Sequence, residues 1–143
     1  MPRITFPVAV HLFLLKGNQI LLLRRYNTGY EDGNYSVIAG HIDGGETVYA
    51  AMLREAKEEA GIDIASGGLR IVQVMHRKKS DEERIDYFFT CDNWSGTIKI
   101  MEPDKCDELI WVNIDNLPDN TIDYICAAAD NYKAGVPFSI FGW

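Results

Sequence analysis

The sequence predicts an α/β layered domain in which two amphipathic helices pack on a sheet. Three observations predict it: short strand-like runs recur along the chain, two longer segments carry apolar residues at helical spacing, and glycine-bearing or polar turns separate them. The chain has 143 residues, 47% of them hydrophobic, which suits one compact domain over residues 1–143 with a core of its own.

The amino-terminal part is predicted to form a β-hairpin followed by an extended segment. Residues 8–15 and 19–25 are apolar, β-rich runs, and the Lys-Gly-Asn sequence between them is typical of a turn. A polar, glycine-bearing loop is expected over 26–34, and a short extended segment over 35–39. A glycine-dense loop, 40–46, then leads to the first helix.

The segment 47–60 is the clearest predicted helix. Its apolar residues recur at helical spacing, namely Val48, Ala51, Met52 and Ala56. Gly61 follows directly, and glycine is the residue that most readily adopts the left-handed conformation that ends a helix. The helix is therefore expected to begin at Glu46 or Thr47 and to end at Gly61.

The second half is predicted to contain another hairpin, a short strand and a second helix. Runs 69–79 and 84–91 are strand-like and flank the polar turn 80–83, and a further strand is expected over 110–114. Residues 121–134 place apolar side chains on one face and precede Gly135 and Pro137, which end helices.

Composition excludes several classes of protein. The net charge of -7 and the pI near 4.9 argue against a surface that coats nucleic acid polymers. Three widely spaced cysteines without a C-x-x-C pair predict neither a disulfide framework nor a zinc knuckle, and favour a reducing, cytoplasmic setting. The apolar run 8–15 is far shorter than a membrane span, so no membrane partner is expected.

Three carboxylates are predicted to crowd one face of the first helix. Glu55, Glu58 and Glu59 stand at positions i, i+3 and i+4, so their side chains share one turn. Such like charges repel unless a cation relieves them, and Mg²⁺ prefers oxygen ligands and bridges readily to phosphates. A solvated acidic helix face is the common alternative for this pattern taken alone.

The residues around these carboxylates favour the metal-site interpretation. The pattern G-x5-E-x7-R-E-U-x-E-E-x-G-U, where U is aliphatic, is complete and consists of Gly40, Glu46, Arg54, Glu55, Ala56, Glu58, Glu59, Gly61 and Ile62. A chance match has a probability of about 10⁻⁸ to 10⁻⁷ in a chain of this length. The segment from Gly40 to Ile62 thus resembles the Nudix box of Nudix hydrolases. The resemblance implies an αβα sandwich with a mixed central sheet and two main helices.

The resemblance also implies roles for the residues of the box. Glu58 and Glu59 would ligate a catalytic Mg²⁺, with Mn²⁺ as the alternative, and the backbone carbonyl of Gly40 would join them. Glu55 would be a ligand or a general base.

The other two charged positions of the box have a structural role in the family. Glu46 and Arg54 would brace the loop against the helix through an ion pair.

A further carboxylate outside the box commonly completes such sites. Glu102 is the first candidate because it opens an acidic loop just before the strand at Trp111, and Glu108 is the second. An ordinary solvated loop is the alternative for Glu102, since exposed loop carboxylates are common.

Candidate substrate-binding residues lie outside the box. Arg24 and Arg25 end a predicted strand and could hold phosphate oxygens, although a charged strand end is the commoner explanation. Candidates for contacts with the base are Asn120 and Asp119 after Pro118, and the aromatic residues Tyr35, Phe88 and Trp111. No role is expected for His11 or His76.

The expected activity is metal-dependent hydrolysis of a nucleoside triphosphate to a monophosphate and pyrophosphate. Motifs that mark NADH-cleaving, ADP-ribose-cleaving and dinucleoside-polyphosphate-cleaving members are not found, which leaves the MutT-like branch. Two alternatives stay open: a pyrophosphatase acting on nucleotide sugars or related NDP-X compounds, and a nucleotide-sensing Nudix module without catalysis. The sequence does not decide whether the chain forms a homodimer.

Overall fold

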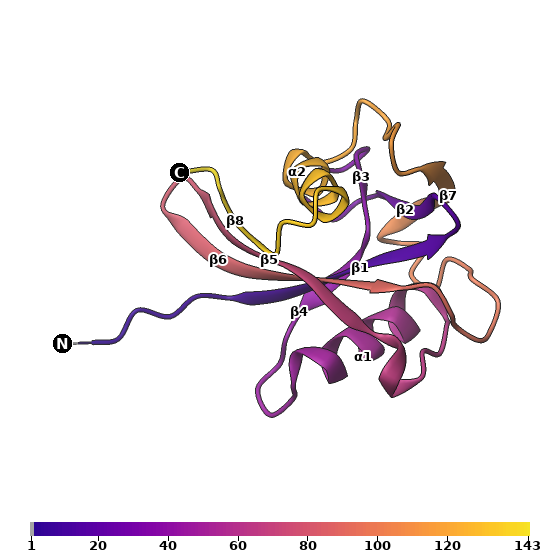
Figure 1. The fold of residues 1–143 in the computed structure, drawn as a ribbon, viewed down its shortest axis with the longest axis horizontal. Helices are drawn as coiled ribbons and strands as arrows, with labels where there is room; N and C mark the ends of the chain where they lie inside the picture. Colours follow the sequence, from indigo (N-terminus) through magenta and orange to yellow (C-terminus); the bar gives the residue numbers. More distant parts are fainter. Residues whose placement is uncertain (1) are drawn as a thin grey trace.

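The computed structural model describes residues 2–143 and confirms a mixed α/β architecture. The elements are β1 (Val8–Lys16), β2 (Gln19–Arg25), β3 (Tyr35–Ser36), β4 (Ile38–His41), α1 (Val48–Ala60), the short 3-10 helix η1 (Ser66–Gly68), β5 (Arg70–Lys79), β6 (Glu82–Cys91), β7 (Cys106–Asn113), α2 (Asp123–Lys133) and β8 (Phe138–Phe141). Helices α1 and α2 lie on opposite sides of the strands (Figure 1).

The sheet is mixed, as the resemblance implied. Its strands follow the order β3-β2-β1-β6-β5-β8, with β4 paired to β1 and β7 paired to β2. The pairs β1·β6 and β5·β8 are parallel, whereas the hairpins β1·β2 and β5·β6 are antiparallel. Long crossings therefore connect the parallel pairs, and α1 lies within one of them.

Strand β1 changes neighbour along one of its edges. Residues 9–12 pair with β4, whereas Leu15 and Lys16 pair with β2. Strands β4 and β2 therefore separate from each other along this edge of β1. Side chains of both strands can enter the space between them. This division positions the site described below.

Each face of the sheet has its own hydrophobic cluster. Under α1 the cluster includes Leu12, Met52 and Phe89, all fully buried. Under α2 it includes Phe13 and Phe88, also fully buried. Alternating residues of the same strands supply the two clusters, as expected for strands covered on both faces.

Local capping explains the bounds of α1. The Thr47 side chain accepts a hydrogen bond from the Ala50 amide at 3.1 Å, and Gly61 has φ 72° and donates its amide to the Lys57 carbonyl. Both ends agree with the prediction from sequence.

Replacing the cap should cost a measurable part of the stability. Thr47→Ala removes the side-chain acceptor and is expected to lower the free energy of unfolding by about 1 kcal/mol, whereas Thr47→Ser should retain most of it. Urea denaturation compares the two. Equal midpoints for both variants would contradict this account of the helix start.

Several element boundaries differ from the prediction. The extended segment expected over 35–39 is divided between β3 and β4, and α2 covers Asp123–Lys133 rather than 121–134. Glu82 and Glu83 belong to β6, so the hairpin turn is shorter than 80–83. Strand β7 begins at Cys106 rather than at residue 110, because its polar first residues pair with the end of β2. Strand β8 was not predicted, since four residues after a Gly-Val-Pro turn give little periodicity.

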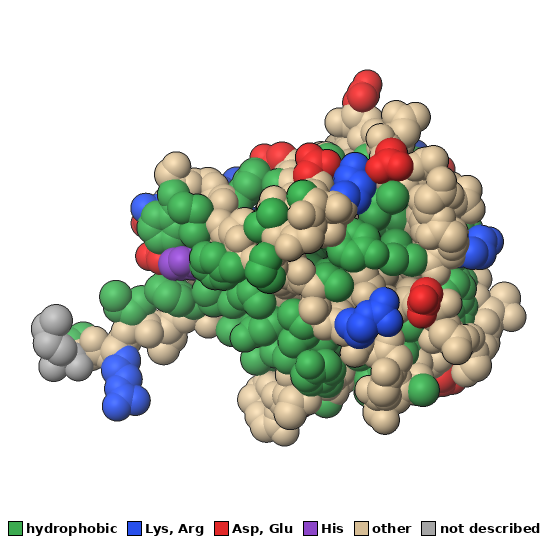
Figure 2. Space-filling view, viewed as in Figure 1, with side chains coloured by type: hydrophobic (Ala, Val, Ile, Leu, Met, Phe, Trp, Pro, Cys, Tyr) green, Lys and Arg blue, Asp and Glu red, His purple; other side chains and the backbone are tan. Residues whose placement is uncertain are grey.

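Strand β8 forms an edge of the sheet and keeps apolar side chains exposed, notably Phe138 and Ile140. Figure 2 shows hydrophobic surface running from the amino-terminal arm across this part of the sheet toward α1. Among residues 2–143, no helix is long and apolar enough to cross a membrane.

Candidate active site

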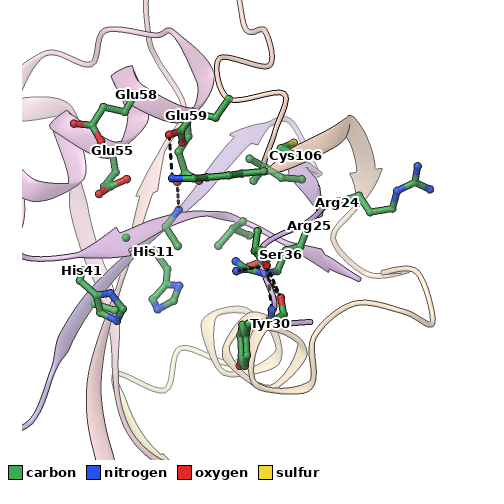
Figure 3. A pocket seen from close by; sticks show the side chains of 18 of the residues that line it. His11, Arg24, Arg25, Tyr30, Ser36, His41, Glu55, Glu58, Glu59 and Cys106 are labelled. Atoms are coloured by element: carbon green, nitrogen blue, oxygen red, sulfur yellow. Dashed lines mark hydrogen bonds and ion pairs between the residues drawn. The ribbon is translucent and has the colours of Figure 1, made fainter. Parts of the chain in front are cut away.

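A cavity of about 410 Å³ lies where the sheet divides beside α1. Its lining comes from both sides of the division: β4 supplies Ala39 and Gly40, and β2 supplies Arg24 and Arg25. Figure 3 shows the α1 carboxylates on one side of this pocket and Tyr30 on the other.

The carboxylates lining the cavity are Glu55, Glu58, Glu59 and Glu102. The structure therefore brings together the three helix carboxylates and the first of the two loop candidates.

Glu59 is held against the edge of β4. Its Oε1 accepts a hydrogen bond from the Ala39 amide at 2.7 Å (Figure 3). Burial of the carboxyl raises the pKa of Glu59 to about 8, which outweighs the lowering effect of the Ala39 amide. A nearby cation would relieve this unfavourable charge.

Glu55 lies directly over Gly40. A Cβ atom added at Gly40 would lie 2.1 Å from the Glu55 Cδ atom, so only glycine at position 40 leaves room for this carboxylate. Burial raises the pKa of Glu55, although Arg54 Nη1 donates to its Oε1 at 2.8 Å and opposes the shift.

The ion pair expected between Glu46 and Arg54 is present. Arg54 Nη2 lies 2.7 Å from Glu46 Oε1 and also donates to the His41 carbonyl, so one guanidinium joins the helix, the loop and the end of β4. The bond from Arg54 lowers the pKa of Glu46. This pair fixes the loop that follows Gly40.

The two loop candidates have different positions. Glu102 lines the cavity and lies 3.6 Å from Lys105 Nζ. Glu108 belongs to β7, where it accepts a hydrogen bond from the Tyr35 hydroxyl, and it does not line the cavity. Of the two, Glu102 is therefore the one near the helix carboxylates.

The donor set fits a hard cation. The three α1 side chains offer oxygen atoms only, which suits Mg²⁺ or Mn²⁺, and the three atoms nearest to a Cβ placed at Gly40 all belong to the Glu55 side chain. Within residues 2–143, no three His, Cys, Asp or Glu side chains converge tightly enough to form a ready-made ligand set.

Comparison with known proteins decides the family. The family model described as the NUDIX domain matches residues 5–129. The chain belongs to the Nudix family. The segment from Gly40 to Ile62 lies within the matched residues and is its Nudix box.

Curated relatives include two kinds of Nudix enzyme. The chain is 29% identical over 117 residues to the NAD-capped RNA hydrolase NudC of Stutzerimonas stutzeri, covering 82% of this chain and 39% of that protein. It is 31% identical over 117 residues to the ADP-ribose pyrophosphatase of Methanocaldococcus jannaschii, covering 82% and 68%. The present chain thus spans about two-fifths of the length of the NudC relative.

Solved structures share the fold. The MutT NUDIX hydrolase from Burkholderia pseudomallei superimposes with a TM-score of 0.81 at 24% identity, covering 88% of this chain and 97% of that one. A bifunctional NMN adenylyltransferase/ADP ribose pyrophosphatase from Francisella tularensis, complexed with AMP and Mn ion, gives 0.73 at 18% identity and covers 94% and 43%.

Arg24 and Arg25, the two arginines predicted to bind phosphate, both line the cavity beside α1, but each also bonds to other protein groups. Arg24 pairs with Asp107 through two hydrogen bonds, of 2.8 and 3.1 Å, and this pairing raises its pKa. Arg25 donates to the Tyr30 carbonyl and to Thr28 Oγ1, so it orders the loop 26–34.

The predicted base-contacting residues do not line the cavity. Asn120 donates to the Gly33 carbonyl, and the Tyr35 hydroxyl bonds Glu108. The prediction that Phe88 stacks on a base is wrong, because its side chain is fully buried in the core under α2. Trp111 stacks on Trp94 at a centroid distance of 5.9 Å. Asp119 is likewise outside the lining.

A buried polar network beneath the cavity was missed. Asp86 lies between His11 Nε2 at 3.0 Å and Arg77 Nε at 2.7 Å, and the Arg77 guanidinium lies 3.6 Å from the centre of the Tyr124 ring. His11, Arg77 and Tyr124 all line the cavity. The sequence feature that could have indicated this network is the presence of His11, Arg77 and Asp86 within three strand-forming segments.

Asp86 and Arg77 form a buried ion pair. Burial raises the pKa of Asp86, but the bonds from His11 and Arg77 outweigh this effect and lower it to about 2. Burial lowers the pKa of Arg77, yet the bond with Asp86 and the nearby Tyr124 and Tyr30 phenols raise it overall. Arg77 therefore remains a charged donor beneath the cavity.

Proposed function

We propose that this Nudix hydrolase cleaves the pyrophosphate link of a nucleoside triphosphate or a related NDP-X compound in a metal-dependent reaction. The products would be a nucleoside monophosphate and either pyrophosphate or a second phosphorylated fragment. One observation carries the proposal: the helix carboxylates and two arginines of β2 line a single cavity, so a cation site and phosphate-binding groups face the same space.

The side chains would divide the work. Glu55, Glu58 and Glu59, with the Gly40 carbonyl, would hold Mg²⁺ or Mn²⁺, which when bound neutralises pyrophosphate oxygens and acidifies water. Glu102 lines the same cavity and would take a proton from the attacking water.

Two arginines would have different roles, one structural and one in substrate binding. Arg54 keeps the loop and helix in register through Glu46. Arg25 is positioned to hold phosphate oxygens once the substrate enters.

Two substrate classes compete. The absence of branch-specific motifs favours a nucleoside triphosphate, and the likeness in fold to MutT proteins agrees with it. The names of the curated relatives, an NAD-capped RNA hydrolase and an ADP-ribose pyrophosphatase, favour an NDP-X compound. The net charge of -7 supports a small nucleotide over a nucleic acid polymer.

A substrate panel tests the proposal. Canonical and oxidised nucleoside triphosphates, ADP-ribose, NAD⁺ and nucleotide sugars are incubated with Mg²⁺, and the products are separated by chromatography, with Glu58→Gln as the control. Monophosphate and pyrophosphate, lost in the variant, would establish the triphosphate class. Cleavage confined to ADP-ribose, NAD⁺ or sugar nucleotides would establish the NDP-X class. Binding without turnover of any compound would favour a sensor module and refute catalysis.

Gly40→Ala is expected to lower kcat/KM by about 100-fold, because the new Cβ displaces the Glu55 carboxylate. The clash is with the end of a flexible side chain, so the melting temperature should change little. Gly44→Ala is the matched control, since its Cβ would meet nothing within 4 Å. Steady-state kinetics on the best panel substrate measures both, and wild-type activity in Gly40→Ala would show that the position of Glu55 is unimportant.

We also propose a cytoplasmic setting. The support is chemical: Cys91, Cys106 and Cys126 are all free thiols, and a reducing compartment keeps them so.

A further inference from the structure

A second cavity, of about 300 Å³, adjoins the active-site cavity. Three residues line both: Tyr30 from the loop 26–34, Arg77 from β5 and Tyr124 from α2. We call these three residues the junction. Figure 3 places Tyr30 across the pocket from the α1 carboxylates, so a substrate held at those carboxylates would extend toward the junction.

The junction presents hydrogen-bond donors without protein acceptors. Arg77 is 5% exposed, and its Nε and Nη2 atoms donate to Asp86. Within residues 2–143, the hydrogen bonds of the Arg77 side chain use only its Nε and Nη2 atoms, and the Tyr30 and Tyr124 hydroxyls have no hydrogen-bond partner. Arg77 can only donate, and its planar end is rigidly placed by Asp86 and by the Tyr124 ring.

Further cations surround the junction. Lys79 Nζ and Arg25 Cζ each lie 5.2 Å from the centre of the Tyr30 ring. The carboxylates that line the second cavity already have partners: Glu31 accepts from Asn34, and Asp123 accepts from the Tyr124 amide. The free groups at the junction are therefore one guanidinium and two hydroxyls, all able to donate, with further cations nearby, and this combination matches an oxyanion.

The buried charges are poorly explained by stability alone. A buried ion pair such as Arg77 with Asp86 is often no more stabilising than apolar residues of the same volume. A ligand-binding role gives a reason for placing a fixed guanidinium beneath a cavity.

We propose that the junction of Tyr30, Arg77 and Tyr124 binds a phosphate group of the substrate that is remote from the carboxylates of the Nudix box. This proposal rests on the proposed function and specifies its substrate. The phosphate has two sources to distinguish: the terminal phosphate of a nucleoside triphosphate, or a phosphate on the sugar of an NDP-X compound.

The test compares substrates that differ by one phosphate. ATP is paired with ADP, and NADP⁺ with NAD⁺, and kcat/KM is measured with Mg²⁺ for wild type, Tyr30→Phe and Tyr124→Phe. Each variant removes only a hydroxyl, so the fold and the Arg77 stacking remain. Tyr132→Phe, on the same helix as Tyr124 but outside both cavities, is the matched control.

Each junction variant should lower kcat/KM about tenfold for the compound with the additional phosphate, which is ATP or NADP⁺. The kcat/KM for the other member of the same pair, ADP or NAD⁺, should stay unchanged. An effect confined to ATP assigns the terminal phosphate, and one confined to NADP⁺ assigns the sugar phosphate. Equal effects on both members of a pair, or none, would overturn the proposal while the proposed function stands.

If none of the four nucleotides is cleaved, the result counts against the proposed function for these substrates, and binding decides the junction separately. Calorimetry of metal-free protein with inorganic phosphate should then give a dissociation constant about tenfold weaker in the Tyr30→Phe, Tyr124→Phe double variant than in wild type. An unchanged constant would overturn the junction proposal.

Discussion

Glu59→Gln is expected to lower kcat by about 1000-fold while leaving the protein folded. The amide is isosteric with the carboxylate, and its oxygen can still accept the hydrogen bond from the Ala39 amide. Because burial makes the Glu59 charge unfavourable, the neutral side chain should also keep or raise the melting temperature of the metal-free protein. Loss of activity would then come from loss of the metal-binding charge.

Calorimetric melting and steady-state kinetics, each with and without Mg²⁺, measure these effects. Wild type should melt higher when Mg²⁺ is present, and Glu59→Gln should lose most of that increase. Glu82→Gln, an exposed carboxylate on β6, serves as the control and should behave as wild type. Near-normal turnover in Glu59→Gln would remove Glu59 from the catalytic set.

Asp86→Asn is expected to cost about 3–5 kcal/mol of unfolding free energy and to lower the melting temperature by on the order of 10 °C. The variant leaves the buried Arg77 guanidinium without its anion and weakens the bond to His11. Urea denaturation at pH 7 measures the loss. A change below about 1 kcal/mol would show that Asp86 and Arg77 do not form a buried ion pair.

The pH dependence has a definite sign. The folded pKa of Asp86, about 2, lies below its ordinary value of 3.8, so the folded state binds this proton less readily than the unfolded state. The resulting stabilisation, roughly 2 kcal/mol, is present above pH 4 and is lost as the pH falls through the folded pKa of about 2. Asp86→Asn should lose this contribution, so the stability difference between wild type and variant should narrow by roughly 2 kcal/mol at low pH.

The sequence was sufficient for the Nudix box and the elements that carry it. A complete motif fixes residue spacing on one helix, and capping by Thr47 and Gly61 is a local interaction, so both could be predicted without knowledge of the fold. The pairing of Arg54 with Glu46 was also accessible, because the resemblance assigned it.

The part of the cavity lined by His11, Arg77 and Tyr124 was less predictable because long-range pairing builds it. His11 and Asp86 are 75 positions apart, and they meet only because β1 lies parallel to β6. Phe88 was considered a base-stacking candidate, but its place in the core depends on α2 covering that face. Glu108 looked like a loop carboxylate because the polar start of β7 has no strand periodicity.

The most direct test of the central claim is to titrate metal-free protein with Mn²⁺ and to follow bound metal by electron paramagnetic resonance together with turnover of the best substrate. The account predicts that turnover is absent in chelator, rises in proportion to bound Mn²⁺, and is lost together with tight binding in Glu59→Gln. Full turnover in chelator, or wild-type Mn²⁺ binding by Glu59→Gln, would contradict the assignment of the α1 carboxylates as the metal site of this hydrolase.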